Sequence, residues 1–136
     1  LIPLSVKLLQ RGKKIRLHDK GMPIRNWLHA SDTATAVTAI IDSGVVNEIF
    51  NVSGGFEQEN WKTVKSIIEY YHLSTEGDIF KVNWKDYVDL EHVREGQDVR
   101  YSLNDDKLRG LGWRPNKVFD CEIEKIVEHY IKHFKW

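Results

Sequence analysis

The chain has 136 residues, of which 41% are hydrophobic and 11% aromatic, enough to bury one core and too many for a disordered chain. Twenty basic residues balance twenty acidic ones, so no overall charge would draw the chain to nucleic acid or to an anionic membrane. The single cysteine, Cys121, excludes an intrachain disulfide and is compatible with a reducing cytoplasm, and the apolar runs are too short to cross a membrane.

The first part of the chain predicts two helices separated by a short extended segment. Apolar residues recur at helical spacing over residues 1–11, which predicts the first helix. Residues 14–18 predict a short strand. Ser31 or Asp32 can cap the second helix, and Gly44 would close it.

The middle of the chain predicts a strand, a long helix and a second strand. Residues 49–52 predict a compact strand that ends at a pair of glycines. Asn60 can cap a strongly amphipathic helix. A polar loop is expected over residues 72–77, a strand over 78–82 and an extended loop over 83–97. This alternation is typical of an α/β protein.

The last part predicts two more helices. After an extended piece at residues 99–101, Ser102 with Asp105 gives a capping-box signal for a short helix through Leu108. The final helix carries one apolar stripe, formed by Ile123, Ile126, Val127, Tyr130, Ile131 and Phe134. With about five helices and several short strands, residues 1–136 are expected to form one small α/β domain.

Three residues are candidates for binding an anion. Arg25 precedes a tryptophan, Asn51 lies just before a pair of glycines, and Arg94 lies in a loop before Gly96. A guanidinium presents planar donors that match two phosphate oxygens, and glycine lets a ligand approach the backbone. Taken singly, each has an ordinary structural interpretation as a stacked arginine, a turn or a solvated surface charge. Asp32 could orient Arg25 or act only as a helix cap.

Common catalytic and metal-binding motifs are missing from the sequence. No Gly-x-Gly-x-x-Gly turn, no Gly-x-Ser-x-Gly motif and no Tyr-x-x-x-Lys pair occurs. His129 and His133 have the i, i+4 spacing of a metal pair, but no His-Glu-x-x-His pattern accompanies them. We therefore expect no catalytic residue, no metal and no cofactor site within this chain.

The order of several short segments is more specific than any one of them. These segments are Leu1-Ile2-Pro3, Gly12-Lys13, Lys20-Gly21, Ile24-Arg25-Asn26-Trp27 with Asp32, Asn51 with Gly54, Arg94 with Gly96 and Asp98, Arg100-Tyr101, and Gly112-Trp113-Arg114-Pro115. Together they resemble the C-terminal part of the extended short-chain dehydrogenases/reductases, the nucleotide-sugar epimerase and dehydratase family. Within that family the resemblance is strongest to the dTDP-glucose and UDP-glucose 4,6-dehydratases.

The resemblance implies a small α/β substrate-binding domain whose Rossmann half is absent. In that family the Rossmann half binds NAD and carries a Tyr-x-x-x-Lys pair. The chain starts without methionine and within an apolar pattern, so we expect a fragment of a longer cytoplasmic enzyme that is inactive by itself. The implied partners are a nucleoside-diphosphate sugar, the protein's own N-terminal Rossmann domain and, in the parent enzyme, a second copy in a homodimer.

The resemblance also implies binding roles for seven residues, which are Arg16, Leu17, His18, Arg25, Asn51, Arg94 and Gln97. Arg25 and Arg94 would hold the diphosphate from two sides, with Asn51 between them. Residues 16–18 would line the pocket for the base, partly through backbone groups.

The sequence departs from the dehydratase pattern on both sides of this site. Asn26 replaces the usual aspartate, Glu95 the usual proline and Gln97 the usual histidine, while His18 stands where tyrosine is common and Arg16 where proline is common. The first hypothesis is an NAD-dependent dehydratase, which moves a hydride from hexose C4 to NAD, eliminates water across C5–C6 and returns the hydride to C6. A UDP-sugar 4-epimerase or decarboxylase, and a non-catalytic module that binds nucleoside diphosphates, remain open alternatives.

Overall fold

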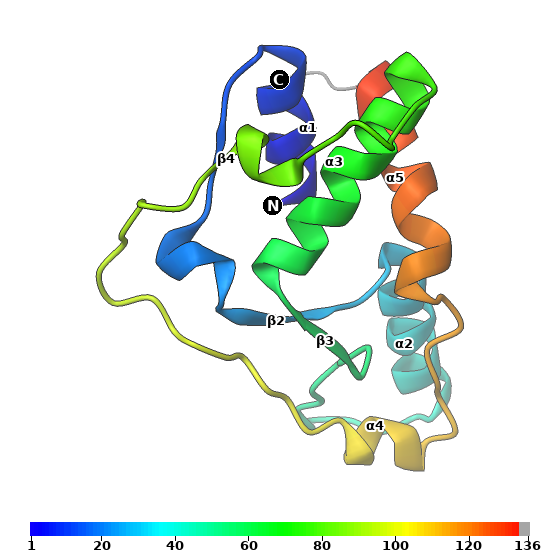
Figure 1. Cartoon of the computed structure of the whole chain (residues 1–136). Coiled ribbons are helices and arrows are strands. Elements are labelled where there is room, and N and C mark those ends of the chain that lie inside the picture. Colours follow the sequence, from blue (N-terminus) through cyan, green and yellow to red (C-terminus); the bar gives the residue numbers. More distant parts are fainter. Residues whose placement is uncertain (134–136) are drawn as a thin grey trace.

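A computed structural model describes residues 1–133, and Figure 1 shows several helices joined by short strands and long loops. The α-helices are α1 (Ile2–Gln10), α2 (Ala30–Asp42), α3 (Asn60–Glu76), α4 (Asp106–Gly110) and α5 (Phe119–His133). The strands are β1 (Ile15–Arg16), β2 (Ile24–Trp27), β3 (Phe56–Glu59) and β4 (Val88–Asp89), and η1 (His18–Gly21) and η2 (Trp84–Tyr87) are 3₁₀ turns. The prediction of a small α/β domain with about five helices is confirmed, while Phe134 of the predicted stripe lies outside the described residues.

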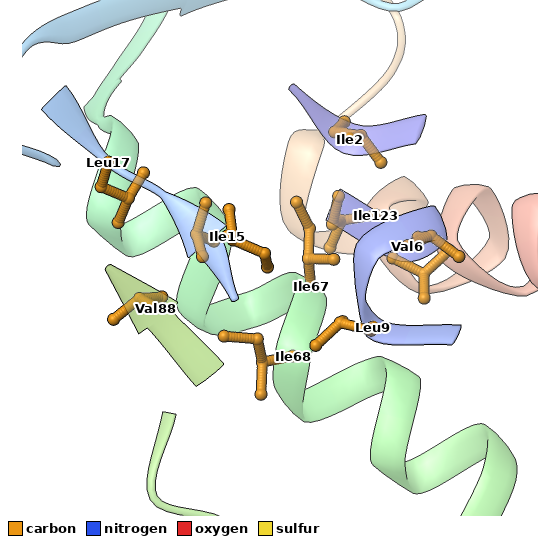
Figure 2. Packing of buried hydrophobic residues seen from close by; sticks show 11 residues of the cluster. Ile2, Val6, Leu9, Ile15, Leu17, Ile67, Ile68, Val88 and Ile123 are labelled. Carbon is orange, nitrogen blue, oxygen red and sulfur yellow. The ribbon is translucent and has the colours of Figure 1, made fainter. Parts of the chain in front are cut away.

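The main core lies between α1, α3 and α5. Figure 2 shows Val6 and Leu9 of α1 facing Ile67 and Ile68 of α3, with Ile123 of α5 beside them. Apolar residues recur every three or four positions on each helix, so each helix buries one stripe. The buried members of the cluster are Ile2, Val6, Leu9, Ile15, Leu17, Val64, Ile67, Ile68, Val88, Ile123 and Val127.

A second, smaller core joins α2 to α4. Ala36 of α2 and Leu108 of α4 are fully buried, and Trp113 packs with them. The indole N–H of Trp113 donates a hydrogen bond to Thr35 Oγ1 over 3.0 Å. Burial and this hydrogen bond together hold the segment between α4 and α5 against α2.

Two pairs of short strands bring distant segments together. Strand β2 pairs with β3 in antiparallel orientation, with Arg25 opposite Gln58. Strand β1 pairs with β4 in parallel, with Ile15 opposite Val88, so the strand expected over residues 14–18 is present in shortened form. Neither β2 nor β3 was predicted, because both are rich in polar residues and become strands only by pairing with each other.

Two predicted strands are absent from the described chain. Residues 49–52 are irregular, and Ile49 is 87% exposed. The backbone carbonyl of Ile49 accepts a hydrogen bond from Lys107 Nζ over 2.9 Å. Residues 78–82 form a turn in which Phe80 is 96% exposed. These apolar segments have no strand partner among residues 1–133, and a lone strand cannot satisfy its backbone groups.

Helix boundaries also differ from the predictions in two places. The polar segment 72–77 is not a loop, because α3 continues through it and buries His72 in its last turns. The helix ends at Gly77, which adopts a left-handed conformation with φ of 74°. The short helix expected from Ser102 begins only at Asp106.

The predicted N-terminal caps of α2 and α3 are replaced by neighbouring residues. His29 caps α2, since its Nδ1 accepts a hydrogen bond from the Ser31 backbone N–H over 3.1 Å. Glu59 occupies the cap position of α3 without a side-chain hydrogen bond, and Asn60 is the first helical residue. Neither α2 nor α3 is therefore capped by the residue expected from the sequence.

Asp32 has a structural role that differs from both interpretations of the sequence. Its carboxylate is 2% exposed and accepts backbone N–H hydrogen bonds from Asn116 over 3.1 Å and from Lys117 over 3.0 Å. It therefore neither caps α2 nor orients Arg25. Instead it ties α2 to the segment that leads into α5.

Replacing Asp32 by alanine is expected to lower the free energy of unfolding by about 3 kcal/mol, since two hydrogen bonds to a charged group are lost at about 1.5 kcal/mol each. Urea denaturation followed by tryptophan fluorescence would measure this loss. Asp42→Ala, which removes the same charge from an exposed site on the same helix, is expected to change stability by no more than about 0.5 kcal/mol. Equal losses in the two variants would contradict a specific role for Asp32.

Candidate functional site

A pocket of about 400 Å³ opens where β1, η1 and β2 face the segment after β4. Six of the seven residues predicted to bind substrate line this pocket, namely Arg16, Leu17, His18, Arg25, Arg94 and Gln97. His18 and Arg94 are 76 positions apart in the sequence and meet here because β1 and β4 run side by side. The fold thus gathers into one cavity residues that the sequence presents as separate motifs.

Arg25 lies on β2 with its guanidinium held in one orientation. Its Nη1 donates to the carbonyl of Ile24 over 2.7 Å, and its Nη2 donates to the carbonyl of Asp98 over 3.0 Å. The guanidinium carbon lies 4.5 Å from the centre of the Tyr101 ring, a cation–π contact. Two carbonyls and one ring therefore fix the plane of the guanidinium, which forms no ion pair with a carboxylate of residues 1–133.

The Tyr101 ring that stacks on Arg25 carries no charge. A hydrogen bond to the Asp98 carboxylate, together with the charge of that group, raises the pKa of the Tyr101 hydroxyl above its usual value. Since the usual value is already near 10, the hydroxyl keeps its proton at neutral pH. Tyr101 therefore acts as a platform for the arginine rather than as a base.

Arg94 enters the pocket from the loop that follows β4. Its backbone N–H donates a hydrogen bond to Nδ1 of His18 over 2.8 Å. His18 opens η1, a tight turn in which Asp19 and Lys20 adopt positive φ angles of 47° and 54°. The turn packs closely against α3. A Cβ added to Gly21 would lie only 2.7 Å from Trp61 Cβ. A rigid turn therefore holds one end of the Arg94 segment.

The pocket is cationic although the chain as a whole is neutral. Arg16, Arg25 and Arg94 line it, and none of the described residues that line it is an aspartate or glutamate. Its other lining residues include the amides of Asn26 and Asn60. Guanidinium groups without a paired carboxylate favour a multiply charged anion, and phosphate oxygens match their planar donors.

Asn51 lies apart from this group. Its side chain is exposed, lines no part of the pocket, and donates a hydrogen bond to the carbonyl of Asn104 over 3.0 Å. Asn60 occupies the pocket instead, because it follows β3 and its backbone N–H donates to the carbonyl of Pro23 beside β2. The β2–β3 pairing brings Asn60 against Pro23 and into the same pocket as Arg25. The only sequence signal for it was the asparagine at a helix start, which we interpreted as a cap.

The end of β2, next to the pocket, is held by a close backbone contact. Oδ1 of Asn26 accepts a hydrogen bond from the Gly54 backbone N–H over 3.1 Å. A Cβ on Gly54 would lie 2.3 Å from the carbonyl oxygen of Trp27, so only glycine fits at this position. Asn26 and Gly54 therefore fix the end of the strand that carries Arg25.

The pocket lining has no proton-transfer pair, and the described residues have no metal-binding group. Tyrosine and lysine are absent from the pocket lining within residues 1–133, so it contains no proton-transfer pair of the Tyr-x-x-x-Lys kind. The rings of His129 and His133 lie 5.0 Å apart, but no group of three His, Cys, Asp or Glu side chains in that range is placed to bind a metal ion. None of the helices in this part of the chain is both long and apolar enough to span a membrane. The geometry therefore indicates a site that binds an anion.

Comparison with known proteins agrees with the resemblance seen in the sequence. The family model described as GDP-mannose 4,6 dehydratase matches residues 1–126. The dTDP-D-glucose 4,6-dehydratase of Bos taurus is 34% identical over 134 residues, which cover 98% of this chain and 37% of the bovine protein. The chain thus spans well under half the length of this relative.

Solved structures show the same similarity. The dTDP-glucose 4,6-dehydratase of Streptomyces venezuelae, solved with NAD bound, superposes with a TM-score of 0.78 at 30% identity over 96% of this chain and 38% of that protein. The UDP-glucose 4-epimerase of Thermotoga maritima superposes with a TM-score of 0.71 at 18% identity, over 97% of this chain and 39% of that one, which shows a shared fold. The match over residues 1–126, the similar relatives and the superposed structures together place the chain in the GDP-mannose 4,6-dehydratase family.

Proposed function

We propose that this chain is the nucleotide-sugar-binding portion of an NAD-dependent 4,6-dehydratase that acts on dTDP-glucose or UDP-glucose in the cytoplasm. The observation that carries the proposal is a pocket that three arginines line and that no aspartate or glutamate among the described residues lines. A nucleoside diphosphate brings two negatively charged phosphates and a base with polar edges, which suits a cationic pocket with amides on its wall. The similarity to dTDP-glucose 4,6-dehydratases supports the same assignment.

Within this pocket we assign the diphosphate to Arg25 and Arg94, which enter from two different segments. Asn60 takes the position that the sequence had suggested for Asn51, and its amide would hold a phosphate or a sugar hydroxyl. The base would lie against residues 16–18, and Gln97 would complete the wall. Charge-assisted bonds of this kind hold the hexose in place for chemistry that other groups carry out.

NAD, the hydride acceptor in such a reaction, is assigned to the part of the enzyme that lies outside this chain. The chain contains no Gly-x-Gly-x-x-Gly turn between a strand and a helix that could hold a dinucleotide. The residues present fit a nucleoside diphosphate and do not fit NAD. What this chain contributes is therefore binding and orientation of the substrate, and we expect the isolated chain to be inactive.

The test is a product assay on a protein that joins this chain to the sequence encoded before Leu1. Incubation with NAD and either dTDP-glucose or UDP-glucose is expected to yield a 4-keto-6-deoxy sugar. A sugar inverted at C4 would instead favour the epimerase alternative. If the upstream sequence lacks both a glycine-rich strand–helix turn and a Tyr-x-x-x-Lys pair, the enzyme assignment fails and only a non-catalytic binding module remains.

We also propose that the N-terminal Rossmann domain packs on an exposed apolar face of α2 and the segment after it. Val37 and Ile41 are 48% and 70% exposed and lie one helical turn apart, so they share one side of the helix. Val46 and Ile49 follow at 76% and 87% exposed. An apolar surface of this kind usually marks an interface, and the relatives contain a large part that this chain lacks.

In isolation, this face is expected to make the 136-residue chain self-associate. Light scattering over a concentration series would measure the association. The double variant Ile41→Lys/Val46→Lys should shift the chain toward a monomer, whereas Phe80→Lys, which changes an equally apolar and exposed residue elsewhere, should not. A chain that is already monomeric at high concentration would count against this role for the face.

A further inference from the structure

The hydrogen bond between His18 and Arg94 connects two sides of the proposed binding pocket. His18 lies on η1, beside the residues assigned to the base, and Arg94 lies on the loop assigned to the diphosphate. In the described chain, it is the one hydrogen bond that ties residues 90–97 to a distant segment. The placement of Arg94 in the pocket therefore depends on a side chain from the opposite wall.

The donor in this hydrogen bond fixes the chemical state of the imidazole. A backbone N–H can only donate, so Nδ1 of His18 must accept and cannot carry a proton. A neutral ring with its proton on Nε2 satisfies this requirement, whereas an imidazolium carries a proton on both nitrogens. The contact with Arg94 can thus exist only while His18 is neutral.

We propose that His18 is a positioning residue that holds Arg94 in the pocket through its unprotonated Nδ1, so that nucleoside-diphosphate binding weakens when His18 is protonated. This inference rests on the proposed function of the pocket. Protonation would set a ring N–H against the Arg94 N–H, and the segment that carries Arg94 would move away from the diphosphate. Binding would therefore weaken when acidification protonates His18.

The other residues that line the pocket around His18 are cationic or uncharged. Arg16 on β1, Arg25 on β2, and His92 and Arg94 on the loop after β4 share its pocket. From α3, which packs against η1, the pocket receives the uncharged Asn60. On its own turn His18 is followed by Asp19 and Lys20, both of which are exposed.

The first test follows the contact itself by NMR in the 136-residue chain, without ligand. The ring nitrogen shifts of His18 are expected to report a proton on Nε2 and a hydrogen-bonded Nδ1. The Arg94 amide should shift and exchange faster with solvent as His18 is protonated. His18→Asn keeps an acceptor oxygen at the position of Nδ1 and should hold the Arg94 amide at every pH, whereas His18→Phe should release it at every pH. An Arg94 amide that is indifferent to both variants would overturn the proposal.

The second test measures dTDP and UDP binding in the protein that includes the upstream sequence. His18→Phe is expected to weaken binding about fivefold, the value of one typical hydrogen bond, and His18→Asn should restore affinity and remove the pH dependence. His92→Asn, a control within the same pocket, should leave the pH response in place. Affinity that rises on protonation, or is unchanged in His18→Phe, would sink the proposal. The wild-type protein could bind neither nucleotide while the Arg94 amide still changes with the protonation of His18. That result would contradict the proposed function but support the hydrogen bond between His18 and Arg94.

Discussion

Replacing Gly54 by alanine is expected to lower the free energy of unfolding by about 3 kcal/mol or more and to disturb the strand that carries Arg25. The added Cβ would lie 2.3 Å from the carbonyl oxygen of Trp27 and 3.3 Å from the Cα of Leu28. These are backbone atoms of β2 and the residue after it, so no flexible side chain can move aside. Overpacking by a single methyl usually costs about 1–3 kcal/mol, and a rigid backbone neighbour places this case at or above the upper end.

The clash would also break the contact that holds β2 in place. Gly54 donates its N–H to Asn26 Oδ1, and moving the backbone to admit a methyl group lengthens that hydrogen bond. Asn26 lies next to Arg25, so the orientation of the guanidinium would change together with stability. Loss of stability and loss of nucleotide binding are therefore expected in the same variant.

The matched control is Gly110→Ala. Gly110 lies in α4, has no positive φ, and an added Cβ there would meet no atom within 4 Å. Alanine is favoured over glycine in a helix by about 1 kcal/mol, so this variant should be as stable as the original or slightly more so. Urea denaturation monitored through the five tryptophans would compare the two. Similar midpoints for Gly54→Ala and Gly110→Ala would contradict the close backbone contact.

The sequence predicted the elements whose signal is local. The helices α1, α3 and α5 carry apolar residues at helical spacing, and this periodicity needs no knowledge of the partner. Strands β2 and β3 have no such signal, because Arg25, Asn26, Glu57, Gln58 and Glu59 are polar. They form strands by pairing with each other, and pairing between distant segments cannot be read from either segment alone.

The same limit explains which site residues were predicted. Arg25 and Arg94 came from the ordered motifs of a family, and the pocket brings them together. Asn51 came from the same resemblance and also stands before glycines, but the structure places it outside the pocket. Asn60 was not predicted because its position in the same pocket as Arg25 follows from the register of β2 with β3, in which Ile24 lies opposite Glu59. That register cannot be predicted from the residue types or from their spacing in the sequence.

Replacing Arg25 by alanine is expected to weaken the binding of dTDP or UDP by about 30- to 100-fold, or about 2–3 kcal/mol, in the protein that includes the upstream sequence. The guanidinium is the group in the pocket whose plane is already fixed, by the carbonyls of Ile24 and Asp98 and by the ring of Tyr101. Little side-chain entropy remains to be lost when it binds a diphosphate, so most of each charge-assisted hydrogen bond contributes to affinity. Arg25→Lys keeps the charge without the planar pair of donors, so its affinity for dTDP or UDP should lie between those of the original protein and Arg25→Ala.

Calorimetric titration at fixed ionic strength would measure these affinities. The control is Arg100→Ala, which removes the same charge from the strand-like segment beside β2. Arg100 pairs with Glu57, with Nε and Oε2 2.9 Å apart, and does not line the pocket, so its loss should change affinity less than about twofold, as expected for an exposed ion pair. If Arg25→Ala and Arg100→Ala bind nucleotide equally well, general electrostatic attraction would account for binding. A large loss confined to Arg25 would instead identify the oriented guanidinium as the group that holds the diphosphate.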